Sequence, residues 1–322
     1  AHLRTHGLSL YISPEGQRSL FVINHPVNRG SEPELVEVFD EVAPGQFRHR
    51  ETFKDPLFNS PNDLAAVGPR QFYVANDKVL NGGLAAGLQQ FGIGGSPLTY
   101  FDGAEARVVA DDIAAGSGIN VSAGGGTLYV LTNRGDAKDF KIVTAPVTTP
   151  GPEHWQDLVE HRPGRLILSH SVFKRHLVWL ERENGLPRIM VRRLADGATH
   201  AIAFDEEAYS LGLSGAYEFD TDIIRFTYSS MTTPSETFDY NMETRERTLL
   251  KVQEVPSGHD PENYVTRRLL APAQDGELVP VSLLYRKDLK LDGSAPCLLY
   301  GYGSYGITVP AAFNTNCLSL VD

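Results

Sequence analysis

The chain has 322 residues, of which 41% are hydrophobic and 21% charged, with a formal net charge of −11. This balance is that of a globular protein, and the negative charge argues against nucleic acid or an anionic membrane surface as a partner. No apolar run reaches the ~18 residues of a membrane span. The two cysteines, Cys297 and Cys317, define no disulfide framework.

A loose repeat runs along most of the chain. Each unit is a short apolar strand, a polar turn, a second apolar strand and then two more strands. The five passes begin at HGLSLYIS, PNDLAAVG, GINVSAGG, RLILSHSV and LSGAYEFD. Four short strands per unit, repeated in this way, are typical of β-propeller blades. Turn signals such as SPEG, AGGG and FDTD separate the runs, as four-stranded meanders require. We therefore expect an all-β fold, a β-propeller.

The C-terminal segment leaves the number of blades open. A turn-rich stretch, VPSGHDPENY, is followed by three strand-like runs, VTRRLLAPAQ, LVPVSLLYRK and APCLLYGYGSYG. Because an open ring exposes strand edges, either the five units close alone or these runs supply a sixth blade. The sequence thus predicts five or six four-stranded blades. Unsatisfied apolar strands in this segment also make self-association an expectation.

Three polar residues begin the innermost strands of successive units: His6, Asn62 and Asn120. Equivalent positions of neighbouring blades face the same central channel, so these side chains are expected to cluster at one mouth of it. Amide oxygens suit calcium, which collects six to eight oxygen ligands. The alternative is that they are unrelated turn residues, since Asn is common at strand starts.

Residues 5–130 resemble the paraoxonase family of calcium-dependent arylesterases and lactonases. The resemblance rests on THGLSLY, VINHP, FNSPNDLAAVGPRQFYVAND, ARVVADDIA and SGINVS. It implies that Asn62 and Asn120 are ligands of a catalytic calcium ion. It also implies that Asp63 and the backbone carbonyl of Leu8 are ligands of a structural calcium ion. A small ester or lactone would then be the substrate.

The same resemblance implies that His6 and His25 form a histidine pair that activates water or shapes the lactone site. A histidine with a pKa near neutrality can accept a proton, and a cation on the substrate carbonyl would stabilise the oxyanion. The alternative for His25, in VINHP, is a strand-end turn residue.

The calcium site is expected to be incomplete. In paraoxonases an acidic pair from a first blade and an Asp-Asn pair from a later blade complete it. The blade that carries the acidic pair is absent here, and the segment of the later blade has been replaced. The replacing segment has Ile167 and nearby apolar groups at the position where the third unit has Asn120. Few carboxylates remain, so calcium binding should be weak.

From residue 131 onward the chain resembles oligopeptidase B, of the prolyl oligopeptidase family. The resemblance rests on LTNRGDAKDFKIVTAP, HLVWLERENGLPRIMV, SSMTTPSETFDYNMETRERTLL and VPVSLLYRKD. LLYGYGSYG matches an early strand of the hydrolase domain, in which Tyr302 would be an oxyanion-hole donor. A nucleophilic serine in G-x-S-x-G and its partners would follow, but the sequence ends at Asp322. Serine peptidase activity is therefore not expected, and Tyr302 is expected to be a vestigial donor that serves as a packing residue.

The segment TLYVLTN, residues 127–133, satisfies both families. The predicted parts are paraoxonase-like blades in 1–130, oligopeptidase B-like blades in 131–255, and a linker with truncated hydrolase strands in 256–322. Three functional hypotheses follow: a recombined or engineered hybrid scaffold without efficient catalysis, a weak calcium-dependent lactonase or aryl esterase, and a peptide- or partner-binding propeller fragment lacking the peptidase triad. A natural fusion is the alternative to recombination.

Overall fold

The computed structural model describes residues 3–29, 31–77, 96–113, 118–122, 124–214, 218–303 and 307–322. The chain divides into two compact units, an N-terminal unit, Ala1–Lys174, and a C-terminal unit, Arg175–Asp322.

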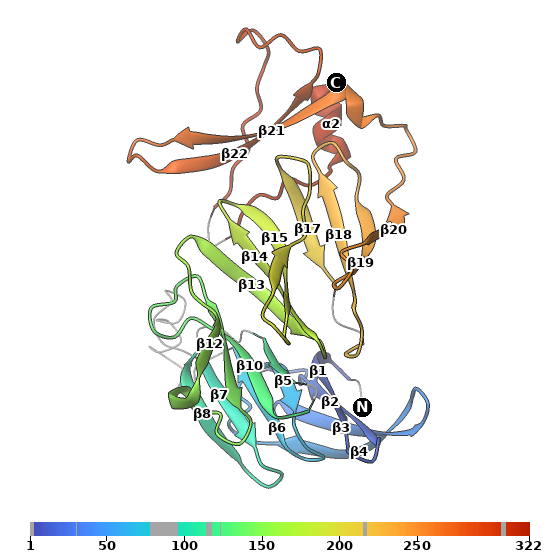
Figure 1. Ribbon diagram of the computed structural model, residues 1–322, viewed down its shortest axis with the longest axis vertical. Helices are drawn as coiled ribbons and strands as arrows, with labels where there is room; N and C mark the ends of the chain where they lie inside the picture. The colour runs from blue at the N-terminus through green and yellow to red at the C-terminus, as the bar shows by residue number, and fades with distance from the viewer. Residues whose placement is uncertain are drawn as a thin grey trace. The chain divides into compact units, whose positions relative to one another are not determined.

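The N-terminal unit contains three four-stranded antiparallel sheets and one further strand, β13 (Arg165–Val172) (Figure 1). The first has the order β1-β2-β3-β4 and consists of β1 (Thr5–Ile12), β2 (Arg18–Asn24), β3 (Leu35–Ala43) and β4 (Gln46–Lys54). The second has the order β5-β6-β7-β8 and consists of β5 (Pro61–Ala66), β6 (Phe72–Asn76), β7 (Ser96–Phe101) and β8 (Ala106–Ile113). The third contains β9 (Ile119–Val121), β10 (Thr127–Thr132), β11 (Lys141–Pro146) and β12 (Gln156–Val159), with the 3-10 helix η1 (Pro152–His154) before β12.

Two more four-stranded sheets follow along the chain. The fourth consists of β13 (Arg165–Val172), β14 (His176–Glu183), β15 (Leu186–Arg193) and β16 (Thr199–Ala201), and the fifth of β17 (Tyr209–Leu213), β18 (Ile223–Ser230), β19 (Glu236–Asn241) and β20 (Arg247–Val252). The prediction of five four-stranded propeller blades is confirmed.

The sixth-blade alternative is not confirmed. After the 3-10 helix η2 (Pro261–Asn263), only β21 (Tyr264–Pro272) and β22 (Leu278–Arg286) pair, as a two-stranded sheet, and the short helix α2 (Thr315–Val321) comes last. The third expected run is residues 295–306, and its described part, residues 295–303, forms no strand. No helix in the described ranges is long and apolar enough to cross a membrane.

Turn chemistry explains the blade hairpins. Between β14 and β15, Asn184 and Gly185 both have positive φ, 51° and 72°, and the flanking pair is Glu183 with Leu186. Two consecutive positive φ values define the type I′ turn, whose twist matches that of the strands it joins and which favours Asn-Gly.

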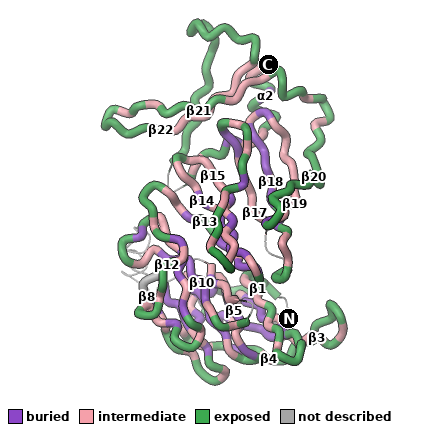
Figure 2. The backbone as a smooth tube through the Cα atoms, viewed as in Figure 1, coloured by how far each residue is buried: buried purple, intermediate pink, exposed green. Residues whose placement is uncertain are grey.

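Neighbouring blades of the N-terminal unit pack through apolar side chains of buried residues; the backbone of buried residues is purple in Figure 2. One cluster, between the first and second sheets, contains five phenylalanines: Phe21, Phe53, Phe58, Phe72 and Phe101. A second cluster joins the second and third sheets around Tyr73, Leu98 and Leu128. The innermost strands follow one another, with β1 beside β5, β5 beside β9 and β9 beside β13.

Candidate functional site

His6 on β1 and Asn62 on β5 are in direct contact. His6 Nε2 lies 2.9 Å from Asn62 Oδ1, and Asn62 Nδ2 donates a hydrogen bond of 2.7 Å to Asp77 Oδ1. Because an amide oxygen only accepts, the proton of His6 is assigned to Nε2. The exposed His6 side chain therefore carries its lone pair on Nδ1.

His25, which follows β2, lies behind His6. The two rings make a T-shaped contact with 5.2 Å between centroids. His25 Nδ1 donates to Glu34 Oε2 at 2.6 Å, and Glu34 is buried. The predicted histidine pair is therefore brought together, and the carboxylate behind it is a residue that sequence reasoning missed.

Asp63, next to Asn62 on β5, accepts two backbone hydrogen bonds. Its Oδ1 accepts from the N–H of Leu64 at 2.9 Å and its Oδ2 from the N–H of Ile119 at 3.0 Å. Burial nevertheless raises the pKa of Asp63 to about 6, although these bonds and His6 act in the opposite direction. A nearby cation would relieve this cost, because it favours the charged form.

Asn120 on β9 contacts a histidine of the next blade. Asn120 Nδ2 lies 3.3 Å from His170 Nε2, and His170, on β13, is only 7% exposed. Ile167, on the same strand, is buried, and its expected equivalence to Asn120 in the repeat stays a prediction. His170 lies three residues further along β13, and the S-H-S sequence in a β-strand was the signal that could have identified it.

His170 is a neutral imidazole at neutral pH. Burial lowers its pKa to about 4, and the carbonyl of Tyr129 acts weakly in the other direction. His170 and Asp63 both lie close to Gly118, since a Cβ built there would be 3.4 Å from Asp63 Oδ2 and 3.6 Å from His170 Cε1, which is ordinary contact. His170 thus lies at the edge of the predicted calcium site.

Leu8, the predicted backbone ligand, lies directly after an irregularity in the β1–β2 ladder. The register shifts between Thr5 and Leu8, and Leu8 then pairs with Val22. Such bulges re-aim local groups. A Cβ on Gly7 would lie 2.8 Å from the carbonyl oxygen of Asn62, so glycine is what allows β1 and β5 to meet here.

The donor atoms fit calcium in kind. Asn62, Asp63, Asn120 and the Leu8 carbonyl offer oxygen ligands of the type calcium prefers. Only one of these four groups is a carboxylate, and the carboxylate of Asp77 is hydrogen bonded to Asn62. The role of each residue as a ligand stays a prediction.

Tyr302 is 51% exposed and is therefore not a core residue. Its expected roles, as a packing residue and a vestigial oxyanion-hole donor, stay predictions. The serine nearest to Tyr302 in the sequence, Ser304 of GYGSYG, is not in a G-x-S-x-G motif and lies outside the described residues.

A second titratable cluster, absent from the sequence predictions, lies in the C-terminal unit. His176, Asp222 and Glu243 offer ligand atoms within 4.8 Å of one another. Each carboxylate also forms an ion pair with an arginine. Arg175 Nε lies 2.8 Å from Asp222 Oδ1, and Arg193 Nε lies 3.4 Å from Glu243 Oε2. These arginines neutralise the carboxylates, so the cluster is assigned to ion pairing.

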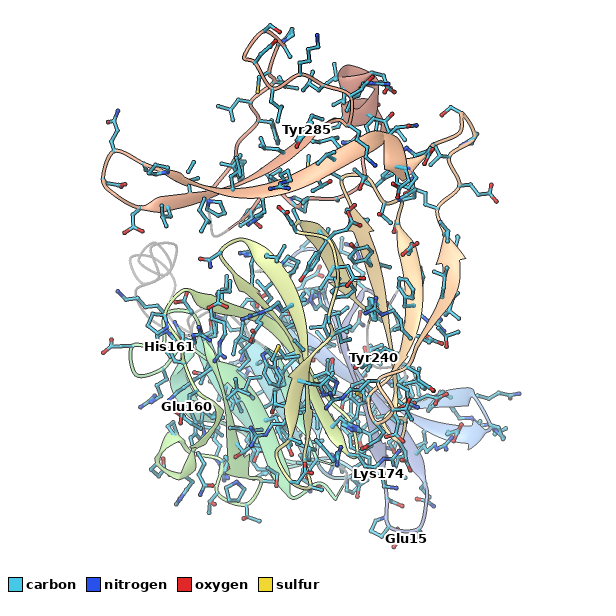
Figure 3. All side chains as sticks on the ribbon, turned by 45° about the horizontal axis from the view of Figure 1, so that its top comes forward. Glu15, Glu160, His161, Lys174, Tyr240 and Tyr285 are labelled. Atoms are coloured by element: carbon cyan, nitrogen blue, oxygen red, sulfur yellow. The ribbon has the colours of Figure 1, made fainter. Side chains whose placement is uncertain are left out.

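A small cavity adjoins this cluster. It has a volume of ≈ 10 Å³ and is lined by His176, Val191, Arg193, Ala198, His200, Met242 and Arg245. His200 Nε2 lies 2.9 Å from the hydroxyl of Tyr240, which is labelled in Figure 3. This volume is about that of one water molecule, so the cavity is too small for an ester substrate.

Two families match the chain in different places. Residues 1–140 match the family described as Arylesterase, and residues 102–253 match the family described as Prolyl oligopeptidase, N-terminal beta-propeller domain. The two matches overlap in residues 102–140, which include the segment TLYVLTN.

Curated relatives follow the same division. Dipeptidyl aminopeptidase BI of Pseudoxanthomonas mexicana is 44% identical over 194 residues, 60% of this chain and 27% of that protein. Serum paraoxonase/arylesterase 2 of Homo sapiens is 33% identical over 132 residues, 40% of this chain and 36% of that protein.

Among solved structures, oligopeptidase B from Trypanosoma brucei with covalently bound antipain matches with a TM-score of 0.69 and 26% identity, over 94% of this chain and 42% of that one. The chain therefore spans only about a quarter to a third of the curated relatives it matches and less than half of this structure. Its N-terminal part is similar to the arylesterase family, and the blades that follow are similar to the N-terminal propeller of the prolyl oligopeptidase family.

Proposed function

We propose that the chain is a hybrid β-propeller whose arylesterase-like part holds a weak calcium site and supports slow hydrolysis of small esters or lactones. The observation that carries this proposal is the unbroken series of contacts across three blades. His6 forms a hydrogen bond with Asn62, on the next blade. Asp63, beside Asn62, accepts a hydrogen bond from the N–H of Ile119 on the third blade, and Asn120 follows Ile119 on β9.

The residues would divide the chemistry as follows. A bound calcium ion supplies stabilisation of negative charge on the substrate carbonyl oxygen. His6 Nδ1 accepts a proton from water, because Nε2 donates to Asn62 Oδ1. That oxygen has two lone pairs, so it can hold His6 and still face a cation.

The low efficiency follows from the ligand set. Calcium affinity depends on ligand charge and number, and the four predicted ligand groups contain a single carboxylate, that of Asp63. His170, which contacts Asn120, is neutral and would offer a metal ion a nitrogen ligand. Calcium, a hard cation, gains little from such a ligand.

The hybrid character is supported by the overlap of the two family matches and by the reach of the structural match. The oligopeptidase B likeness extends over 94% of the chain, including the part that resembles arylesterases in sequence. Because each propeller blade contacts only its neighbours, an exchange of blades needs only two new interfaces to pack.

Replacing His6 with alanine tests the proposed activity. Hydrolysis of phenyl acetate and of δ-valerolactone by the wild type should rise with free calcium. In His6→Ala it should fall by about 10²–10⁴-fold, the usual contribution of a general base. The measurement is the initial rate at fixed pH across a calcium titration.

The matched control is His154→Ala, which removes a histidine that lies 3.7 Å from Glu153 in η1. It should keep the wild-type rate. An initial rate of hydrolysis that does not change with calcium, or that is the same in His6→Ala as in the wild type, contradicts the proposed hydrolase function.

A second candidate, partner binding through the C-terminal segment, is favoured by one observation. Leu298, Leu299 and Tyr300 are consecutive, apolar and 74–85% exposed, and a run of this kind is typical of an interaction surface. If a second copy of this chain is the partner, sedimentation velocity should show concentration-dependent association that the double change Leu298→Ser and Leu299→Ser abolishes. A monomer at all concentrations would exclude it.

A further inference from the structure

A buried carboxylate lies behind the histidine pair, and the strand register explains its place. In the β2–β3 ladder Asn24 pairs with Leu35, so the residues just beyond them, His25 and Glu34, face each other where the two strands end. The N–H of His25 also donates to the carbonyl of Arg4, at 3.0 Å, which ties this corner to the start of β1. The strand register and this backbone hydrogen bond therefore place His25 and Glu34 next to each other.

The two oxygens of Glu34 have separate partners. Oε2 accepts from His25 Nδ1 at 2.6 Å, and Oε1 accepts from Arg29 Nε at 3.0 Å. Arg29 is itself held by its bond of 3.0 Å to the hydroxyl of the buried Ser60. With both oxygens engaged and a side chain only 6% exposed, Glu34 has one orientation.

A carboxylate only accepts hydrogen bonds, so Glu34 fixes the proton of a neutral His25 on Nδ1 and leaves the lone pair on Nε2. His25 Nε2 is buried and has no hydrogen-bond partner in the described part of the chain. The ring that carries it makes the T-shaped contact with His6. The ring of His6 thus lies against a ring whose own orientation is set by Glu34.

We propose that Glu34 is a positioning residue that holds His25 as the Nδ1–H tautomer and, through His25, aligns His6 for proton transfer. This inference rests on the proposed hydrolytic function of the same site. The carboxylate acts as the partner carboxylates of metal-binding and catalytic histidines do, by selecting a tautomer and a ring plane. Removing such a partner typically lowers activity by about 10–100-fold.

The test combines a spectroscopic and a kinetic measurement on the full chain. In protein labelled with [15N]histidine, the two ring nitrogens of His25 should show the Nδ1–H pattern at a pH where the ring is neutral. In Glu34→Gln, whose amide can donate as well as accept, the Nε2–H form should appear. kcat for phenyl acetate should fall about 10–100-fold with KM little changed, and Glu34→Asp should recover part of the loss.

Glu32→Gln is the matched control, because Glu32 lies in the same segment, is exposed and accepts a hydrogen bond from the side chain of Asn28. It should leave both the tautomer and kcat unchanged. A wild-type His25 in the Nε2–H form overturns the proposal, and this result does not require any variant to fold. An active Glu34→Gln enzyme with a changed tautomer overturns it as well, while the hydrolase function stands. An inactive wild type whose His25 is nevertheless held as Nδ1–H by Glu34 supports the positioning and contradicts the hydrolase function alone.

Discussion

Replacing Leu128 with alanine is expected to lower the free energy of unfolding by about 2–5 kcal/mol, the range for large-to-small changes in a packed core. Leu128 is fully buried in the apolar cluster between the second and third blades. It lies on β10, where it pairs with Val121 of β9 on one side and Ala145 of β11 on the other. This strand carries a segment that lies in the overlap of the two family matches, so the proposed hybrid would depend on its packing.

Urea unfolding followed by tryptophan fluorescence measures this loss, since one of the two tryptophans, Trp155, packs against the same cluster. The control is Leu249→Ala, on β20, whose side chain is half exposed and whose loss should cost less than about 0.5 kcal/mol. Equal effects of the two changes would mean that β10 does not hold the blades together.

Removing His170 or Asp63 is expected to reveal two opposed contributions to the pH dependence of stability. The pKa of His170 is lowered to about 4, so between pH 6.5 and 4 the unfolded chain binds more protons than the folded one. The stability conferred by the neutral imidazole is complete above the unfolded pKa and is lost as the pH falls through about 4. A shift of this size corresponds to about 3 kcal/mol.

Asp63 acts with the opposite sign. Its pKa is raised to about 6, so the folded chain binds more protons between pH 6 and 3.8. The stability that the protonated Asp63 side chain contributes is complete below the unfolded pKa and is lost as the pH rises through 6. The free energy of unfolding changes by about 3 kcal/mol across this range, as for His170. In the wild type the two groups largely cancel in this window.

The variants separate them. Relative to the wild type in calcium-free buffer, Asp63→Asn should lose stability on acidification from pH 6.5 to 4, because His170 then acts alone. His170→Gln should gain stability over the same range. Urea midpoints at several pH values give both slopes, and slopes parallel to that of the wild type would show that neither group is buried as described.

The repeat pattern predicts the blades well because it depends on local properties. Alternating apolar residues and Gly- or Asn-containing turns define each hairpin, as Asn184 and Gly185 do between β14 and β15. The contact between His6 and Asn62 could also be anticipated, since equivalent strand starts of neighbouring blades converge.

What could not be predicted depends on register across blades. His170 was missed because the contact with Asn120 falls at the sixth residue of β13 and not near its start. Glu34 was missed because its meeting with His25 follows from the pairing of Asn24 with Leu35. The C-terminal runs looked alike as strands, yet residues 295–303 form none, because apolar character alone does not supply a pairing partner.

The most direct test of the calcium proposal is an amide NMR titration with calcium that follows Leu64 and Ile119, whose N–H groups donate to the carboxylate of Asp63. The account predicts saturable shifts of both amides with a Kd of about 10⁻⁴–10⁻³ M, as for weak calcium sites. Magnesium should not reproduce these shifts, and Asp63→Asn should abolish them. Amides that do not move, or that move equally in Asp63→Asn, would contradict the calcium site and the hydrolase function built on it.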